Sequence, residues 1–211
     1  MNKTNAAAVV ARLKTLYPEA TCALRYEGDP WRLLVMGRLS AQCTDARVNL
    51  VSESLFARYP TAEAMAGALP EELERLIFSC GLYRTKARDL IAASKMLTEE
   101  FGGKLPEEMD DLLRLPGVGR KIANLLRGDI FGLPAIVADT HCIRISRRLG
   151  MVPKEDGSPD KVERVLSSLI EPAEQNDFCH RLVLLGREYC PAKGQDCSSC
   201  PLADLCEKVK L

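Results

Sequence analysis

Apolar residues recur at three-to-four-residue intervals along almost the whole chain, which is the spacing of one helix face. Val9, Leu13 and Leu16 begin the series, and Ala87, Leu90 and Leu97 repeat it in the middle of the chain. Helices are predicted over residues 5–17, 46–59, 84–101, 106–115, 120–128, 141–149, 160–170 and 177–188, with an apolar run at 31–39 and shorter helices after Thr61 and from Pro70. One segment, 133–137, is apolar and β-branched, but it is isolated, so no sheet can be assembled. We therefore predict an all-α protein of about ten short helices with short connections.

Several polar residues mark the expected helix ends. Thr44 and the pair Asp139–Thr140 precede apolar periodic segments, as N-cap residues do. Pro70 with the two acidic residues that follow it suits a first turn. Gly128 is placed where a C-terminal cap is expected.

Length and composition describe a globular protein of one or two domains. Of 211 residues, 46% are hydrophobic and 27% charged. The apolar stretch at 6–11 is too short for a secretory signal, and no run approaches the ~20 apolar residues of a membrane span. We expect a cytosolic protein with no membrane partner, in which the nine cysteines serve metal binding or catalysis more than disulfides.

Positive charge is concentrated in the segment 115–150, although the formal net charge is zero. Six basic residues stand there against two acidic ones: Arg120, Lys121, Arg127, Arg144, Arg147 and Arg148 against Asp129 and Asp139. Such a segment could present a basic face to nucleic acid, or it could form solvated helix faces. Charge alone leaves both readings open.

The C-terminal tail holds four cysteines in the pattern C-x6-C-x2-C-x5-C, namely Cys190, Cys197, Cys200 and Cys206. Four thiolates so close in sequence can converge on one metal centre. Disulfides are disfavoured in a reducing compartment, and structural zinc usually takes two C-x2-C pairs rather than one. The spacing therefore favours an iron–sulfur cluster and leaves zinc as the alternative. The other five are predicted to be small core residues: Cys22, Cys43, Cys80, Cys142 and Cys179.

The stretch "LPGVGRK" at 115–121 predicts a tight turn between two helices. Pro116 ends the first helix, and Gly117 and Gly119 allow positive φ and close backbone approach. The second helix would then begin with exposed N–H groups that suit a phosphate. It is not a Walker loop, because the G-x4-G-K-[ST] spacing is absent. A lone G-x-G before a helix is weak evidence, and by itself it favours a plain tight turn.

Lys121 would lie at the positive end of that second helix, beside Arg120. Both features favour the neutral amine, which is the nucleophilic form. Asp139 follows 18 residues later at another helix start. An amine with a carboxylate suits imine chemistry at a sugar anomeric carbon. Taken alone, Asp139 is better explained as a simple N-cap.

Six segments together resemble the endonuclease III family, helix–hairpin–helix DNA glycosylases with AP-lyase activity. They are "LSAQCTDARVN" (39–49), "GLYRTKA" (81–87), "LPGVGRKIAN" (115–124), "VADTHCIRISRRLG" (137–150), "CHRLVLLGREYC" (179–190) and the four-cysteine tail. They occur in order over essentially the whole chain. The resemblance implies a two-domain all-α fold, with a six-helix domain at about 23–134 that contains the helix–hairpin–helix at about 107–128. Residues 1–22 and 135–211 would form the second domain, with an iron–sulfur cluster loop at 190–206.

The resemblance also implies a role for individual residues. Lys121 would form a Schiff base with the sugar of a damaged nucleotide, and Asp139 would be the catalytic carboxylate. Gln42 would fill the gap left by an extruded base, and Leu82 would intrude into the duplex as a wedge. The amides of Gly117 and Gly119 would hold a phosphate, and the four tail cysteines would ligate a 4Fe-4S cluster. Among the basic residues, we expect Arg120, Arg144 and Arg148 to contact DNA.

We therefore expect a monomeric bifunctional glycosylase/AP lyase of base excision repair, acting on oxidised pyrimidines in double-stranded DNA in a prokaryotic-type cytoplasm, associated with the nucleoid. Alternatives are a glycosylase of the same superfamily with another lesion specificity, monofunctional examples of which lack the hairpin lysine, and a non-catalytic iron–sulfur DNA-binding protein. The chain departs from the family pattern at four places: Gly37–Arg38, Ile122, Arg127–Gly128–Asp129 and Arg147. None of them removes the catalytic pair, and we expect Arg38 and the change at 127–129 to alter the base pocket or the DNA path and with it the substrate preference.

Overall fold

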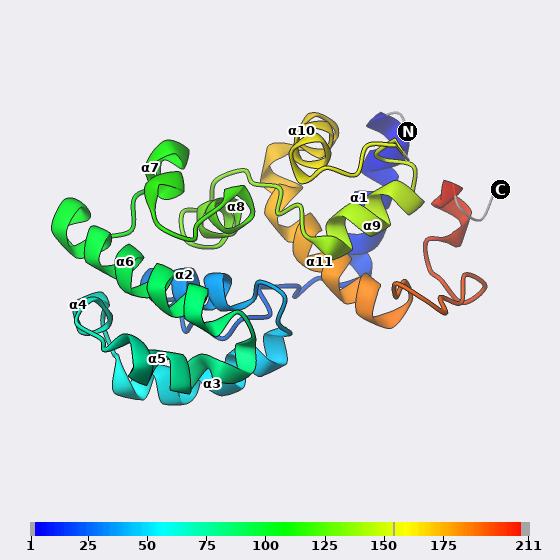
Figure 1. The fold of residues 1–211 in the computed structure, drawn as a ribbon. Coiled ribbons are helices and arrows are strands. Elements are labelled where there is room, and N and C mark those ends of the chain that lie inside the picture. The colour runs from blue at the N-terminus through cyan, green and yellow to red at the C-terminus, as the bar shows by residue number, and fades with distance from the viewer. Residues whose placement is uncertain (1–2, 154, 208–211) are drawn as a thin grey trace. The chain divides into compact units, whose positions relative to one another are not determined.

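The computed structural model describes residues 3–153 and 155–207, and within them the chain is helical without any β-strand (Figure 1). The all-α prediction is therefore confirmed. The chain divides into two compact units, one formed by residues 23–131 and the other by residues 1–22 together with 132–211. We call them the central unit and the terminal unit. Among the helices described, none has the length and apolar character that crossing a membrane requires.

The central unit is built around α6, which contacts α2, α4 and α5. Leu90, Ala93 and Leu97 form its buried stripe, with each side chain about 1% exposed. The hairpin helices α7 and α8 contact each other, and α8 also contacts α2. The elements of this unit are α2 (Pro30–Leu39), α3 (Asp45–Arg58), α4 (Ala62–Ala66), α5 (Pro70–Ile77), the 3-10 turn η1 (Phe78–Cys80), α6 (Tyr83–Phe101), α7 (Met109–Arg114) and α8 (Arg120–Asp129).

The terminal unit is built around α11, which contacts α1 and α9. Phe178 and Leu182 of α11 are fully buried, as are Val9 and Leu13 of α1. A helix from the start of the chain thus completes the core of its last third. The elements are α1 (Lys3–Leu16), α9 (Thr140–Arg148), α10 (Pro159–Leu169), η2 (Pro172–Glu174), α11 (Gln175–Glu188) and η3 (Ala203–Leu205).

Side-chain caps fix several helix starts where the sequence predicts them. The hydroxyl of Thr44 accepts from the N–H of Arg47 at 3.3 Å, and a carboxylate oxygen of Asp139 accepts from the N–H of Cys142 at 2.7 Å. Both N-cap predictions are confirmed. These bonds satisfy amide groups that the helices themselves leave unpaired.

Three local predictions are wrong. Gly128 lies inside α8 and is buried, and the cap of that helix is Ile130. The helix predicted from Pro106 begins at Met109, because Glu108 is extended and Arg127 of α8 donates to the carbonyl of Glu107 at 3.3 Å. Cys22 and Cys43 are half-buried rather than core residues, whereas the other three cysteines of that group are buried as predicted.

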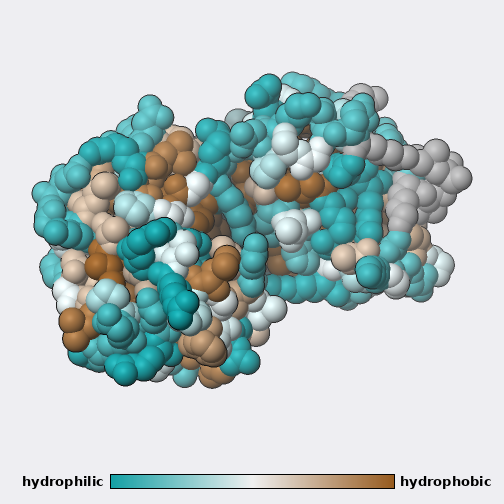
Figure 2. Space-filling view, in the orientation of Figure 1, coloured by the Kyte–Doolittle hydropathy of each residue, from teal (hydrophilic) through white to brown (hydrophobic). Residues whose placement is uncertain are grey.

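Exposed hydrophobic residues are scattered over the central unit. Hydrophobic and hydrophilic residues alternate on the face that Figure 2 shows, without one continuous apolar band. The large hydrophobic side chains that are exposed among the described residues are Leu50, Leu69, Phe78, Leu82 and Leu113. Of these, Leu82 is the one that the sequence singles out for a functional role.

Candidate functional site

The "LPGVGRK" stretch forms the predicted turn between α7 and α8. The N–H of Val118 donates to the carbonyl of Leu115 at 3.0 Å, which closes the turn. Gly119 is the N-cap of α8, and no side chain caps this helix start, in contrast to Asp139 at the start of α9. Lys121 is the second residue of α8 and is exposed, as is Arg120 before it. The first turn of α8 is thus open to an acceptor from outside, such as a phosphate oxygen.

Gly117 is the residue in this turn that requires glycine. Its φ is +78°, and a Cβ atom there would lie 2.6 Å from Nε of Arg38 and 2.9 Å from Cβ of Asp89. Arg38 of α2 forms an ion pair with Asp89 of α6 at 2.7 Å, and both side chains are only 13% exposed. The turn therefore rests directly on a largely buried ion pair.

Gly117→Ala and Gly119→Ala form a matched pair of variants for this turn. We expect Gly117→Ala to lower the free energy of unfolding by about 2–4 kcal/mol, since it adds a side chain at positive φ and against Arg38. Gly119 has φ of −103°, and a Cβ atom added to it would have no neighbouring atom within 4 Å, so Gly119→Ala should cost less than about 1 kcal/mol. Urea denaturation measures both values. Equal losses in the two variants would contradict the assignment of the strain to Gly117.

Two departures from the family pattern contact each other. A Cβ atom at Gly37 of α2 would lie 3.4 Å from the side chain of Ile122 and 3.5 Å from that of Leu125. Ile122 is buried against α2 at this point. These are ordinary van der Waals distances, so Gly37 lies where α8 packs closely on α2.

Gln42 and Leu82 lie in two short turns, and both adopt the left-handed backbone conformation. Their φ values are +54° and +47°, and among the described residues Glu27 is the one other non-glycine residue with positive φ. Gln42 follows α2, and Leu82 lies between η1 and α6. Both side chains are exposed, Leu82 by 55%. Backbone strain of this kind concentrates at functional positions.

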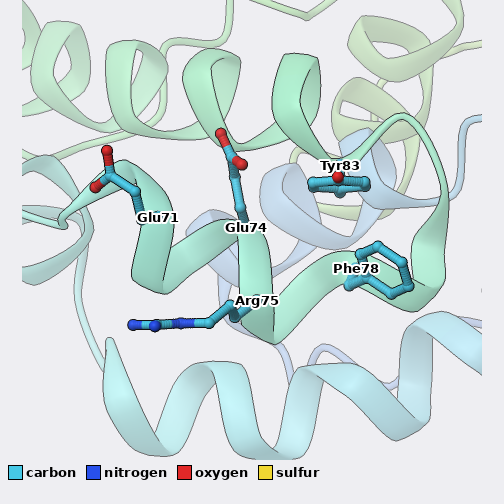
Figure 3. Close-up of a pocket in the computed structure, with 5 residues that line it drawn as sticks. All are labelled: Glu71, Glu74, Arg75, Phe78 and Tyr83. Atoms are coloured by element: carbon cyan, nitrogen blue, oxygen red, sulfur yellow. The ribbon is translucent and has the colours of Figure 1, made fainter.

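A surface pocket of about 410 Å³ opens beside the Leu82 turn, at residues Glu71, Glu74, Arg75, Phe78 and Tyr83 (Figure 3). The rings of Phe78 and Tyr83 face each other with centroids 4.9 Å apart. They brace the chain immediately before and after the turn. Two carboxylates against one guanidinium line the pocket, and this excess of negative charge disfavours a phosphate there.

Lys86 lies beneath both turns, and sequence reasoning missed it. Its side chain is 0% exposed although it carries a charge. The acceptors of its Nζ are the backbone carbonyls of Leu39 (2.8 Å), Ala41 (2.8 Å) and Cys80 (2.7 Å). Burial lowers the pKa of Lys86, yet three carbonyls need the three N–H donors that only the charged ammonium supplies. A signal was available, because Lys86 falls on the apolar stripe of its helix, four residues before Leu90.

Asp139 is the N-cap of α9 and is half-buried. Gly186 of α11 allows the close approach that fixes α9, since a Cβ atom there would lie 2.3 Å from Nδ1 of His141 and 2.9 Å from Ile145. Asp139 belongs to the terminal unit and Lys121 to the central unit. The cap bond from the N–H of Cys142 to Oδ1 fixes the position of the Asp139 carboxylate.

Two arginines of α9 hold the cysteine tail. Arg148 donates to Sγ of Cys190 at 3.1 Å and to the carbonyl of Pro191 at 2.8 Å. Arg144 donates to the carbonyl of Cys190 at 3.0 Å. DNA contacts by Arg144 and Arg148 stay a prediction, and the observed bonds favour a structural role in tethering the tail to α9.

The four tail thiols gather in the terminal unit. Cys206 is buried and the other three are half-buried, and the Sγ of Cys206 donates to the carbonyl of Arg148 at 3.2 Å. Burial raises the pKa of the Cys200 thiol, and the nearby thiols of Cys190, Cys206 and Cys197 raise it further. Over residues 3–153 and 155–207, no three potential ligands are arranged to hold a metal ion. The kind of donor nevertheless suits a soft metal centre, because cysteine thiolates are the ligands that iron–sulfur clusters and zinc share, and Cys200 lies close enough to the other three thiols for them to raise its pKa.

Comparisons with known proteins agree with the all-helical fold. The family described as "HhH-GPD superfamily base excision DNA repair protein" matches residues 35–172. Endonuclease III of Synechocystis sp. is 44% identical over 99% of this chain and 94% of its own length, and that of Bacillus subtilis is 42% identical over 93% and 89%. The fold is similar to that of a trapped endonuclease III–DNA covalent intermediate, with a TM-score of 0.94 and 40% identity over 100% of this chain and 98% of that one. From its motifs, its helical architecture and these similarities, the chain belongs to the endonuclease III family of helix–hairpin–helix base excision repair proteins.

Proposed function

We propose that this protein is a DNA glycosylase and AP lyase that removes oxidised pyrimidines from double-stranded DNA. The observation that carries the proposal is the exposed Lys121 at the open start of α8, directly after the hairpin. The endonuclease III similar to this chain has been trapped as a covalent intermediate with DNA. A covalent bond to DNA requires a nucleophile, and an amine beside a phosphate-binding turn is suited to that task.

Lys121 is the nucleophile in this proposal. Its amine attacks C1′ of the damaged nucleotide, the bond from C1′ to the base breaks, and the base leaves with a proton. The sugar ring opens and a C1′=N Schiff base forms on Nζ. Loss of a C2′ proton then breaks the C3′–O bond and cleaves the strand on the 3′ side. Water hydrolyses the remaining imine and restores the lysine.

Asp139 is the catalytic carboxylate. The sugar gains positive charge as the base departs, and a carboxylate stabilises that charge or moves the protons that the steps require. One of its oxygens is occupied by the N–H of Cys142, which fixes the side chain in one orientation. The cap is therefore part of how the acid is positioned.

Duplex DNA with damaged bases or abasic sites is the partner. The amides of Gly117 and Gly119 hold a backbone phosphate without reading sequence. Gln42 and Leu82 occupy the duplex where the damaged nucleotide is extruded, which offsets part of the cost of unstacking it. The protein acts as a monomer in a prokaryotic-type cytoplasm, associated with the nucleoid.

A 4Fe-4S cluster bound by Cys190, Cys197, Cys200 and Cys206 completes the proposal. When bound, the cluster supplies cross-links between parts of an irregular segment. Arg148 supports this role through its bond to Sγ of Cys190, because a guanidinium stabilises a thiolate. Arg144 and Arg148 tie the same segment to α9, whose first turn Asp139 caps.

Cys200→Ser should release iron and destabilise the tail. We expect the purified wild-type protein to be brown and to contain iron and acid-labile sulfide, and the variant to lose most of both. Cys22→Ser is the matched control, since this thiol is half-buried outside the tail. Measuring iron, zinc and acid-labile sulfide distinguishes an iron–sulfur cluster from a zinc site. A colourless protein with stoichiometric zinc would contradict the cluster.

Borohydride trapping tests the proposed function. Wild-type protein mixed with duplex DNA that carries a thymine glycol should form a covalent adduct, because borohydride reduces the imine to a stable amine. The same duplex without the lesion is the control. If base release, strand cleavage and adduct are all absent, the proposed function is wrong.

A further inference from the structure

The turns that carry Gln42 and Leu82 come from separate parts of the central unit and meet over one buried charge. Leu39 is the last residue of α2, and Ala41 directly precedes Gln42. Cys80 is the last residue of η1, two positions before Leu82. The carbonyls of these three residues all accept from Nζ of Lys86, at 2.7–2.8 Å.

These carbonyls need such a donor. Two of them are at the C-terminal ends of helical segments, where carbonyls have no partner within the helix and carry partial negative charge. A buried carbonyl without a donor is costly, and an ammonium at this point satisfies all three. The thiols of Cys43 and Cys80 also face each other here, and burial with this contact raises the pKa of Cys80 to about 11. The Cys80 thiol is therefore neutral at physiological pH, and Lys86 is the charged group that holds the carbonyls.

Because the backbone of the two turns is strained, Lys86 holds the conformation of both turns as well as filling a buried position. Left-handed backbone at Gln42 and at Leu82 is unfavourable for residues with a side chain, so each turn would relax if its carbonyls were released. Lys86 donates hydrogen bonds to the carbonyl of Ala41, the residue before Gln42, and to that of Cys80, which ends η1 two residues before Leu82. One side chain thus fixes two exposed residues at once.

We propose that Lys86 is a positioning residue for base extrusion, which sets the wedge Leu82 and the gap-filling Gln42 in register with each other. This inference rests on the proposed function, and it adds a buried residue that touches neither DNA nor the reacting atoms. Extrusion of a paired damaged base needs both residues in place at the same moment. An abasic site has no base to extrude, so its processing depends much less on the two turns.

Lys86→Met provides the test, because methionine keeps an unbranched side chain but donates to none of the carbonyls. Two single-turnover rates are measured for each variant: base release from a duplex with thymine glycol, and Schiff-base formation at a preformed abasic site. A loss of folded protein lowers both rates equally, so their ratio reports positioning alone. We expect the ratio to fall about tenfold in Lys86→Met, since unstacking a base costs several times the thermal energy.

Leu97→Ala is the matched control, since it removes a buried side chain of the same helix without touching either turn. Its ratio should equal that of the wild type. If Lys86→Met does not fold, Lys86→Gln replaces it, because an amide has two N–H donors and leaves at least one carbonyl unsatisfied. The fall in the ratio should then be smaller but in the same direction. A wild-type ratio in a folded Lys86 variant overturns the inference, whereas a wild-type protein inactive on both substrates overturns the proposed function and this inference with it.

Discussion

Lys121→Ala should abolish the adduct that borohydride traps on lesion-containing DNA. No other side chain can replace the Nζ that bonds to C1′, so we expect AP-lyase activity to fall by at least about 1000-fold. Lys121 is exposed on the first turn of α8, and truncating it removes no buried contact. The free energy of unfolding should therefore stay within about 0.5 kcal/mol of the wild type.

Lys104→Ala is the matched control for this experiment. Lys104 is another exposed lysine of the central unit, located in the segment after α6. Its loss should leave the adduct intact. Binding of Lys121→Ala to DNA with a stable abasic-site analogue should persist, which separates loss of chemistry from loss of affinity. An undiminished adduct in Lys121→Ala would show that another amine is the nucleophile.

Asp139→Asn separates the observed role of this carboxylate as a helix cap from its proposed role in catalysis. Asparagine caps a helix about as well as aspartate, so α9 should stay intact, with a stability change below about 0.5 kcal/mol. The charge that stabilises the departing base's sugar is lost, however. We expect the rate of base release to fall by at least about 100-fold, the lower end of what a positioned acid or base contributes.

Asp139→Ala and Thr61→Ala complete the comparison. Asp139→Ala removes both cap and charge, so it should lose about 1 kcal/mol of stability as well as activity. Thr61 caps α4 through the N–H of Ala64 at 3.2 Å, and its replacement should cost similar stability with activity unchanged. Single-turnover rates and urea denaturation are measured on all three variants. Wild-type activity in Asp139→Asn would leave Asp139 as a cap alone.

Local sequence signals predict most of this fold, because most of its structure is local. Thr44 and Asp139 cap their helices as expected, and the turn at Gly117 forms where the glycines and proline indicate it. The predicted start of α7 is wrong because the extended Glu108 is the N-cap of that helix, and the carbonyl of Glu107 before it accepts from Arg127 of the following helix. The prediction for Gly128 is wrong because burial against neighbouring helices overrides the low helix propensity of glycine.

The functional residues also differ in whether neighbouring sequence or distant contacts reveal them. Lys121 and the cysteine tail are visible as motifs, because their residues are close in sequence. Lys86 donates hydrogen bonds to carbonyls up to 47 residues away in the sequence, and the residues around Lys86 do not indicate which carbonyls those are. The ion pair of Arg38 and Asp89 joins residues 51 apart beneath the hairpin glycine, so the sequence shows Arg38 only as a departure from the family pattern.

The positive φ angles at Gln42 and Leu82 limit how far the thermal stability of this protein can be raised without loss of function. Glycine at either position would relieve backbone strain of about 1–3 kcal/mol, and neither exposed side chain contributes much to the core. A selection for thermal stability alone would therefore favour glycine at both positions and remove the two residues that we propose engage the lesion. Engineering for thermal stability should therefore keep Gln42 and Leu82 and introduce stabilising substitutions at other positions.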